Sequence, residues 1–220
     1  MKTKPGEIER ESFSIIREEL RARGVIPAAE NEAVILRCIH ASADFDYAET
    51  LRFTPDAVTR GIAAIRSGTP IVTDTNMAKA GVSRAGLGKF GGEVFCFMAD
   101  PLIAEQAKAE GCTRAAAAMR HAAGLYPQAI YAVGNAPTAL LALEDQIRQG
   151  LRPSLIIGAP VGFVNVVESK ERILQICREY EIPAIVAAGR KGGSSIAAAI
   201  CNALIYTAAD MLDPAERGWN

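Results

Sequence analysis

Apolar residues near the start of the chain recur with the 3.6-residue period of an amphipathic helix. Phe13, Ile16 and Leu20 show this spacing within residues 12–20, and residues 31–40 repeat it. Two helices are therefore predicted ahead of the first strand.

A third helix is predicted over residues 54–67. Thr54 is a favourable N-cap, Pro55 suits the first helical position, and Asp56 places an acid in the first turn. The Gly-Thr-Pro sequence at 68–70 ends the helix.

From residue 71 onward, short apolar runs alternate with helical patterns. The predicted strands cover residues 71–73, 94–98, 129–133, 155–157 and 184–187. The predicted helices cover residues 75–80, 101–111, 113–125, 137–149, 168–180 and 194–209. This alternation predicts an α/β fold, a three-layer sandwich whose largely parallel central sheet is flanked by helices. One domain over residues 1–220 is expected, with loose termini at 1–11 and 210–220.

Composition and charge narrow the class of protein. The chain has 220 residues, half of them hydrophobic, and a net charge of −1 from 24 basic and 25 acidic residues. That balance gives no overall positive field for nucleic acid or an anionic membrane. Residues 1–12 lack the apolar core of a signal peptide, and the weakly polar run at 195–209 is too short to span a bilayer. We therefore expect a cytoplasmic protein that binds neither nucleic acid nor a membrane.

The cysteines indicate no metal or disulfide framework. They are five in number, scattered through apolar runs, and without CxxC spacing. We expect reduced thiols in the core. The sequence also shows no His, Cys and carboxylate cluster with metal-ligand spacing, so no metal site is predicted.

Four loops follow predicted strands, at residues 74–77, 134–138, 158–163 and 189–195, and are rich in Gly, Asn and Ser. Such loops let a helix N-terminus receive an anion, although the same residues also serve ordinary turns. Residues 189–195 are the most specific, because Arg190 and Lys191 lie within a Gly/Ser loop that begins a helix. Contact of both cations with an anionic ligand is predicted there.

Nucleotide binding has no support in these loops. Residues 189–195 lack the order of a Walker A motif, and no GxGxxG follows a strand with an acid downstream.

His40 and His121 are the two histidines, and hence the side chains that titrate near neutral pH without perturbation. Arg37 lies three residues before His40, so both occupy one face of a helix. That arrangement allows Arg37 to hold a carboxylate while His40 delivers a proton, although a structural role for His40 is an equal alternative. His121 lies in an alanine-rich helix, where a structural or surface role is favoured.

Three further polar pairs could bind carboxylates or could equally be caps or solvated faces. They are Ser83 with Arg84, Thr113 with Arg114, and Ser14 with Arg17. Each charge-assisted contact contributes about 1.5–3 kcal/mol, so several together would hold a polyanion.

Five segments together resemble the precorrin-8X methylmutase family. They are Ile-His-Ala-Ser-Ala-Asp-Phe-Asp at 39–46, Gly-Asn-Ala-Pro-Thr-Ala-Leu at 134–140, Gly-Ala-Pro-Val-Gly-Phe at 158–163, Glu-Ser-Lys at 168–170, and Gly-Arg-Lys-Gly-Gly-Ser at 189–194. The similarity runs from about Ser12 to Tyr206 with the motifs in family order.

The resemblance implies an isomerase of cobalamin biosynthesis that moves a methyl group from carbon 11 to carbon 12 of precorrin-8X or cobalt-precorrin-8. The products would be hydrogenobyrinate or cobyrinate. The reaction would need no external cofactor, and any cobalt would belong to the substrate. The residues at 43–46 and 190–193 look closer to the cobalt-containing branch.

The resemblance also implies roles for individual residues. His40 matches the family's proton donor, and Ser14 and Arg37 match substrate-binding positions. The pairs 83–84 and 113–114 match polar positions that line the pocket. The resemblance also implies a homodimer whose site lies near the subunit interface. We further hypothesise that a substrate carboxylate supports protonated His40 against the charge of Arg37.

Two other function classes remain as alternatives. A non-catalytic tetrapyrrole carrier would use the same loops without a titrating group, so His40 argues against it. An α/β enzyme acting on another phosphorylated or carboxylated metabolite would lack the visible absorption of a bound corrinoid.

Overall fold

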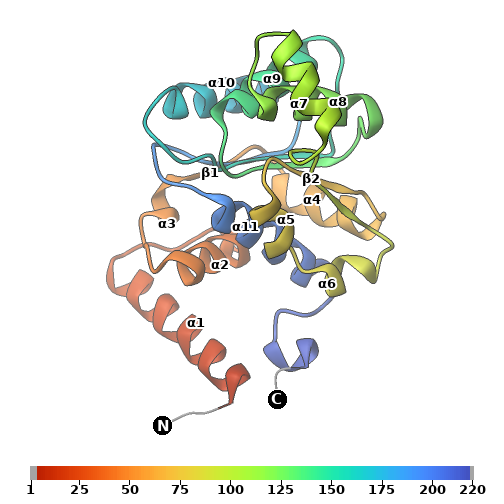
Figure 1. The fold of residues 1–220 in the computed structure, drawn as a ribbon. Helices are drawn as coiled ribbons and strands as arrows, with labels where there is room; N and C mark the ends of the chain where they lie inside the picture. Colours follow the sequence, from red (N-terminus) through yellow and green to blue (C-terminus); the bar gives the residue numbers. More distant parts are fainter. Residues whose placement is uncertain (1–3, 219–220) are drawn as a thin grey trace.

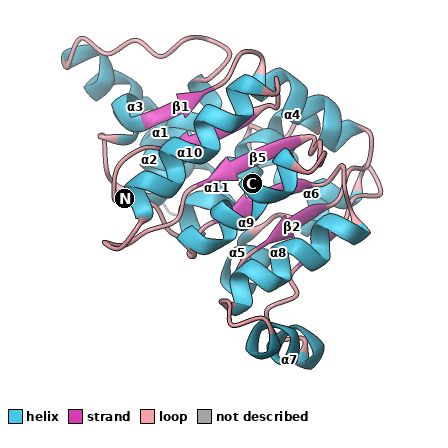
Figure 2. Cartoon of the chain, turned by 90° about the horizontal axis from the view of Figure 1, so that it is seen from above, coloured by secondary structure: helices cyan, strands magenta, loops and turns pink. Residues whose placement is uncertain are grey.

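The computed structural model describes residues 4–218 and contains one six-stranded sheet with the order β1-β6-β5-β4-β2-β3. The strands are β1 (Leu51–Phe53), β2 (Ile71–Thr73), β3 (Val94–Phe95), β4 (Ile130–Val133), β5 (Leu155–Gly158) and β6 (Ala184–Ala187). All neighbouring pairs are parallel except β1 with β6, which is antiparallel. Figure 2 shows β1 beside α3 at one end of the sheet and β2 beside α8 toward the other.

The helices connect these strands and flank the sheet. They are α1 (Pro5–Ala22), α2 (Glu32–Ser42), α3 (Tyr47–Thr50), α4 (Ala57–Arg66), α5 (Asn76–Gly81), α6 (Arg84–Gly88), α7 (Pro101–Ala109), α8 (Arg114–Leu125), α9 (Pro137–Arg148), α10 (Val166–Glu179), α11 (Ser194–Ala208) and the 3-10 helix η1 (Pro214–Arg217).

The helices form one layer on each side of the sheet (Figure 1). Alternate strand residues point to opposite faces. Ile71, Ile130 and Ile157 join the core under α2, α4 and α11. Tyr131 and Ile156 join the core under α8, α9 and α10. The predicted three-layer sandwich with a largely parallel sheet is therefore confirmed.

Several local predictions differ from the structure. The strand predicted over residues 94–98 ends at Phe95, and the short helix at 47–50 was not among the predicted elements. The strand at 51–53 was not predicted, because three residues carry little local pattern. Its extended backbone is held by antiparallel pairing with β6. The short helix at 84–88 was also not predicted. The third helix begins at Ala57 rather than at residue 54.

Thr54 is not the N-cap of α4, because its side chain is used elsewhere. Its buried hydroxyl accepts a hydrogen bond from the backbone N–H of Ala184 at 2.8 Å and donates to the carbonyl of Ile182 at 3.3 Å. Asp56 takes the N-cap position in a left-handed conformation, with φ of 56° and no side-chain cap bond. Attachment to β6 therefore prevails over local capping.

The described part of each terminus forms secondary structure that packs against the other. Helix α1 begins at Pro5, and η1 packs against it. An ion pair of 2.7 Å joins Arg10 to Asp213. Residues 1–3 and 219–220 lie outside the described residues. Between residues 4 and 218, none of the helices combines the length and apolar character that crossing a membrane requires.

All five cysteines are free thiols. Cys38, Cys177 and Cys201 are buried, and burial raises the pKa of the Cys177 and Cys201 thiols to about 12. Cys96 and Cys112 are half-buried, so the expected core location is confirmed for three of the five.

Candidate functional site

His40 and Arg37 both contact the ring of Phe13. The His40 imidazole stacks on Phe13 with the ring centroids 4.9 Å apart and the planes 22° apart. The Arg37 guanidinium lies 4.8 Å from the centroid of the same ring. Thus α1 supplies an aromatic support for two residues one turn apart on α2.

The surroundings of His40 favour its neutral form. Partial burial against its neighbours lowers the pKa of His40, and the charge of Arg37 lowers it further. Glu9 opposes this effect, whereas Arg217 adds to it. The His40 residue is nevertheless exposed to solvent. A negatively charged ligand beside His40 would raise this pKa and favour the protonated imidazole.

Arg37 is already paired within the protein. Its guanidinium donates to the Glu9 carboxylate at 2.6 Å, and its side chain is only 11% exposed. The second oxygen of Glu9 accepts from Arg217 at 2.8 Å. Arg37 thus shares its carboxylate with a residue of the carboxyl-terminal segment, and its role toward substrate stays a prediction.

Ser14 is exposed on α1, and its hydroxyl donates to Glu18 at 3.3 Å. Arg17, one turn away, pairs with Glu32 at 3.1 Å. Both therefore use intramolecular partners in this structure.

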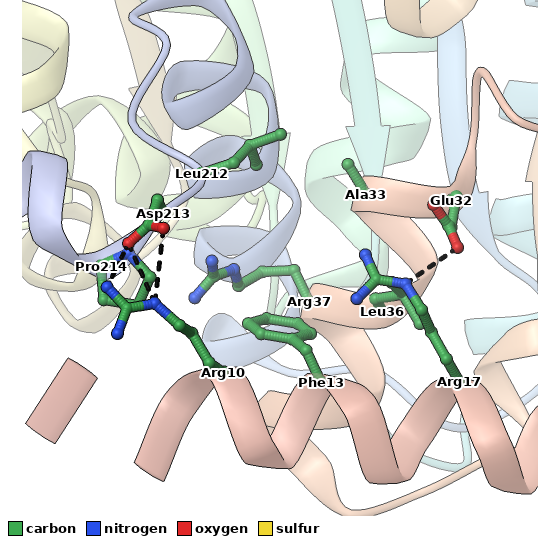
Figure 3. Close-up of a pocket in the computed structure, with 10 residues that line it drawn as sticks. All are labelled: Arg10, Phe13, Arg17, Glu32, Ala33, Leu36, Arg37, Leu212, Asp213 and Pro214. Carbon is green, nitrogen blue, oxygen red and sulfur yellow. Dashed lines mark hydrogen bonds and ion pairs between the residues drawn. The ribbon is translucent and has the colours of Figure 1, made fainter. Parts of the chain in front are cut away.

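A cavity of about 250 Å³ lies between α1, α2 and residues 212–214 (Figure 3). Phe13 and Arg37 separate the other lining residues in the view, with the Arg10–Asp213 pair on one side and the Arg17–Glu32 pair on the other. Each of the three lining arginines is thus matched by a carboxylate.

Lys170, a lysine of α10, holds the backbone of the loop at 189–195. Buried Lys170 of α10 donates to the carbonyls of Gly189 at 2.8 Å and Lys191 at 2.7 Å. Burial lowers the pKa of Lys170 to about 8. The backbone is also close-packed at Gly192, where a Cβ atom would lie 2.3 Å from the carbonyl oxygen of Ala159.

Lys191 connects this loop to the segment that follows α2. Its ammonium donates to Asp44 at 2.7 Å and to Asp46 at 2.6 Å. The two carboxylates raise the pKa of Lys191 above its ordinary value. The structure therefore gives Lys191 two protein partners close to the end of the helix that carries His40.

Arg190 lies over Phe163, with its guanidinium 5.6 Å from the ring centroid. Phe163 is 84% exposed, and the neighbouring Val164 is 77% exposed. A cation and an exposed apolar surface thus stand together at the carboxyl edge of β5 and β6.

The amides of the loop at 134–138 are occupied by a carboxylate of the protein itself. Buried Asp74 accepts hydrogen bonds from the N–H groups of Gly134, Asn135 and Ala136 at 2.8, 2.9 and 2.8 Å. Burial raises the pKa of Asp74, and the three bonds oppose that rise. In this loop the N–H groups at the start of the helix are therefore paired with a side chain of the protein, which agrees with the alternative of an ordinary turn.

Ser83 and Arg84 begin the short helix α6. The Ser83 hydroxyl accepts from the Gly86 N–H at 3.3 Å, and the Ser83 N–H donates to Asn202 of α11 at 2.7 Å. Arg84 is exposed. Helix α6 lies in the same layer as α2, on the other side of α11 (Figure 1).

Thr113 and Arg114 lie at the start of α8, in the layer opposite α2. The Thr113 hydroxyl lies 2.7 Å from that of Thr138 and also caps α8 by accepting from Ala116. Arg114 donates to the carbonyl of Met98 at 3.4 Å. Within one chain, this pair does not share a helix layer with His40.

His121 packs edge-on against Phe97, with the ring centroids 5.0 Å apart, and is half-buried. This placement agrees with the structural role favoured for it. Among residues 4–218, no group of three or more His, Cys, Asp or Glu side chains is placed to hold a metal ion.

Three residues of this region were missed by the sequence reasoning. Glu9 looks like one more acid in a charged helix. Asp74 gives no local signal, because the residues whose N–H groups it binds lie 60 to 62 positions further along the chain. Lys170 was noted only as part of a motif. Its position among apolar residues on α10 is the one local signal for its burial.

The comparison with family models decides the relationship. The model described as precorrin-8X methylmutase matches residues 7–207. The chain belongs to this family. It is therefore a methylmutase, an intramolecular transferase of the isomerase class.

Relatives named cobalt-precorrin-8 methylmutase and relatives named precorrin-8X methylmutase both align with nearly the whole chain. The cobalt-precorrin-8 methylmutase of Leptospira interrogans is 45% identical over 205 residues, covering 90% of this chain and 91% of the relative. The precorrin-8X methylmutase of Pseudomonas aeruginosa is 38% identical over 198 residues, covering 90% and 93%.

A solved structure shares the fold of this methylmutase. The crystal structure of precorrin-8X methyl mutase from Thermus thermophilus superimposes with a TM-score of 0.83 at 43% identity, covering 92% of this chain and 98% of that one.

Proposed function

We propose that this methylmutase moves a methyl group from carbon 11 to carbon 12 of precorrin-8X or cobalt-precorrin-8, with His40 as the acid. Hydrogenobyrinate or cobyrinate would be the product. The observation that carries the proposal is the exposed imidazole of His40, supported by Phe13 and flanked by Arg37. The proposed substrate contacts are Ser14, Arg37, Ser83, Arg84, Thr113, Arg114, Arg190 and Lys191.

The chemistry requires a proton donor near the conjugated ring. A proton delivered to the macrocycle draws electron density from the migrating centre and lowers the barrier. Because burial and the charge of Arg37 lower the pKa of His40, a substrate carboxylate beside it would restore the protonated form. Binding of the substrate would thereby convert His40 into the protonated form that acts as the acid.

The direct test replaces each histidine in turn. We expect His40→Ala to reduce turnover by about 10²–10⁴-fold, the range of general acid catalysis, while the coloured substrate still binds. His121→Ala is the matched control and should keep normal turnover. Single-turnover absorption spectra would follow the reaction. Normal turnover by His40→Ala, with pigment bound, would remove His40 from the mechanism.

The state of the ring metal belongs to the same experiment. The residues at 43–46 and 190–193 look closer to the cobalt-containing branch. Relatives named for the cobalt-containing substrate range from 45% to 36% identity, and the Pseudomonas aeruginosa enzyme named for precorrin-8X is 38% identical, so the preference rests on those residues. We therefore propose cobalt-precorrin-8 as the preferred substrate. Parallel assays with both rings should show faster turnover of the cobalt form, and the reverse order would contradict this preference.

The proposal includes no resident cofactor, because a methyl shift within one molecule needs no external group donor. It also includes a homodimer and a cytoplasmic location. Thr113 and Arg114 lie in the layer opposite His40, so a second copy could bring such a pair to the site. Free cysteines are typical of a reducing compartment. Sedimentation equilibrium should give twice the 23.4 kDa chain mass.

A further inference from the structure

A buried ion cluster joins the two ends of the chain to the helix that carries His40. Glu9 of α1 binds Arg37 of α2 at 2.6 Å and Arg217 of η1 at 2.8 Å. The three side chains are only 5%, 11% and 6% exposed, respectively. One carboxylate therefore connects three elements that are remote in the sequence.

Aromatic rings extend this cluster to His40. Tyr206 of α11 lies against both guanidinium groups, 5.1 Å from Arg37 and 4.6 Å from Arg217. Arg37 also lies over Phe13, and Phe13 stacks on His40. A continuous series of contacts thus runs from the carboxyl-terminal 3-10 helix to the imidazole.

Buried charges keep their geometry only while they remain paired. Removing one partner of a buried ion pair leaves an uncompensated charge, and the remaining groups must move toward water or another partner. Glu9 binds both Arg37 and Arg217. Its loss would free Arg37 to leave the face of Phe13.

We infer that Glu9 is a positioning residue for the proposed reaction: its carboxylate ties Arg37 to Arg217 and thereby holds Phe13 in place beneath His40. This inference rests on the proposed role of His40 as the acid. It assigns to the carboxyl-terminal segment a part in setting the geometry of a histidine on α2.

The charges around His40 give the inference a specific signature. Arg37 on its own helix and Arg217 on η1 lower the pKa of His40, whereas Glu9 on α1 raises it. Tyr206, from α11, contacts the two guanidinium groups. Loss of the Glu9 charge alone would shift the pKa of His40 down in Glu9→Gln, whereas displacement of Arg37 removes a charge with a larger, opposite effect. If Glu9 positions Arg37, the pKa of His40 should therefore not fall in Glu9→Gln, and it should rise in Arg217→Gln.

The experiment is an NMR titration of the two histidine side chains in the full-length protein. His121 is the internal reference and should titrate identically in every variant. Glu19→Gln is the matched control, because Glu19 also lies on α1 and pairs with an arginine, Arg23, but is 41% exposed. It should leave both the His40 titration and turnover unchanged.

Turnover supplies the second measurement. We expect kcat to fall by about 10- to 100-fold in both Glu9→Gln and Arg217→Gln, as a displaced catalytic group would produce. If Glu9→Gln fails to fold, Arg217→Gln still carries the test, because it leaves the pair between Glu9 and Arg37 intact. A His40 titration and a kcat in Arg217→Gln equal to those of the wild type would overturn the inference.

The two proposals can fail separately. Full turnover by His40→Ala would end the acid role of His40. The NMR titration would still report whether the cluster at Glu9 controls the surroundings of that imidazole.

Discussion

The loops at 134–138 and 189–195 look alike in the sequence, but the protein holds them in opposite ways. Both contain glycine and begin a helix at the carboxyl edge of the sheet. In the first, the carboxylate of Asp74 binds three N–H groups. In the second, the ammonium of Lys170 binds two carbonyls. The amides of the first loop, which could receive an anion, are thus paired with the protein's own carboxylate, whereas the second loop presents two exposed cations, Arg190 and Lys191.

The largest effect should come from the loop held by the carboxylate. Asp74→Ala removes the partner of three N–H groups, and each buried donor left unpaired costs about 1–3 kcal/mol. We expect the free energy of unfolding to fall by at least about 3 kcal/mol, measured by urea denaturation. The control is Asp100→Ala, which removes an exposed N-cap bond to Leu102 and should cost about 1 kcal/mol. Equal losses would mean that Asp74 acts as an ordinary cap.

A smaller effect is expected in the loop held by the lysine. Lys170→Met leaves the carbonyls of Gly189 and Lys191 without their donor, at a cost of about 1–3 kcal/mol. The ordinary pKa of lysine is 10.5, and burial lowers that of Lys170 to about 8. Between these values the unfolded chain binds more protons than the native protein, so this group stabilises the native state increasingly as pH rises.

The difference in stability between wild type and Lys170→Met should therefore grow from pH 8 to pH 10.5. Lys108→Met, at an exposed lysine of α7, should show no such trend. Urea denaturation at several pH values checks both variants. A difference that shrinks with rising pH would contradict the assigned burial of the ammonium.

The smallest effect concerns the outer side of the same loop. Lys191→Gln breaks exposed ion pairs to Asp44 and Asp46, which typically contribute about 0–1 kcal/mol and weaken with salt. Thermal melts at low and high salt measure this loss. If Lys191 also binds substrate, Lys191→Gln should raise KM more than Asp44→Asn does. Equal KM values would leave Lys191 as a connection between the loop and the end of α2.

Local pattern was enough to predict most of the fold. The strand at 71–73 is an apolar run between turn residues, and its predicted bounds agree with the structure. The strand at 51–53 depends on pairing with β6, and Thr54 is drawn to Ala184, 130 residues away. Neither contact leaves a signal in neighbouring residues, so neither could be predicted.

The candidate site divides in the same way. Arg37 and His40 could be placed together because helical spacing is local, and both contact Phe13 in the structure. The pairing of Glu9 with Arg37 and Arg217 could not be predicted, because it joins α1 to residues 28 and 208 positions away. Positions of single side chains on one helix follow from sequence, whereas the partners of buried charges follow from the packed fold.

The buried pair between Glu9 and Arg217 also affects how variation in this family is interpreted. The match to the family model covers residues 7–207, so it contains Glu9, Arg37 and His40 but stops before Arg217. A substitution at Arg217 would change the surroundings of the histidine without altering the segment by which membership is recognised. Two chains that match the model equally well can therefore differ in the acidity of the same imidazole.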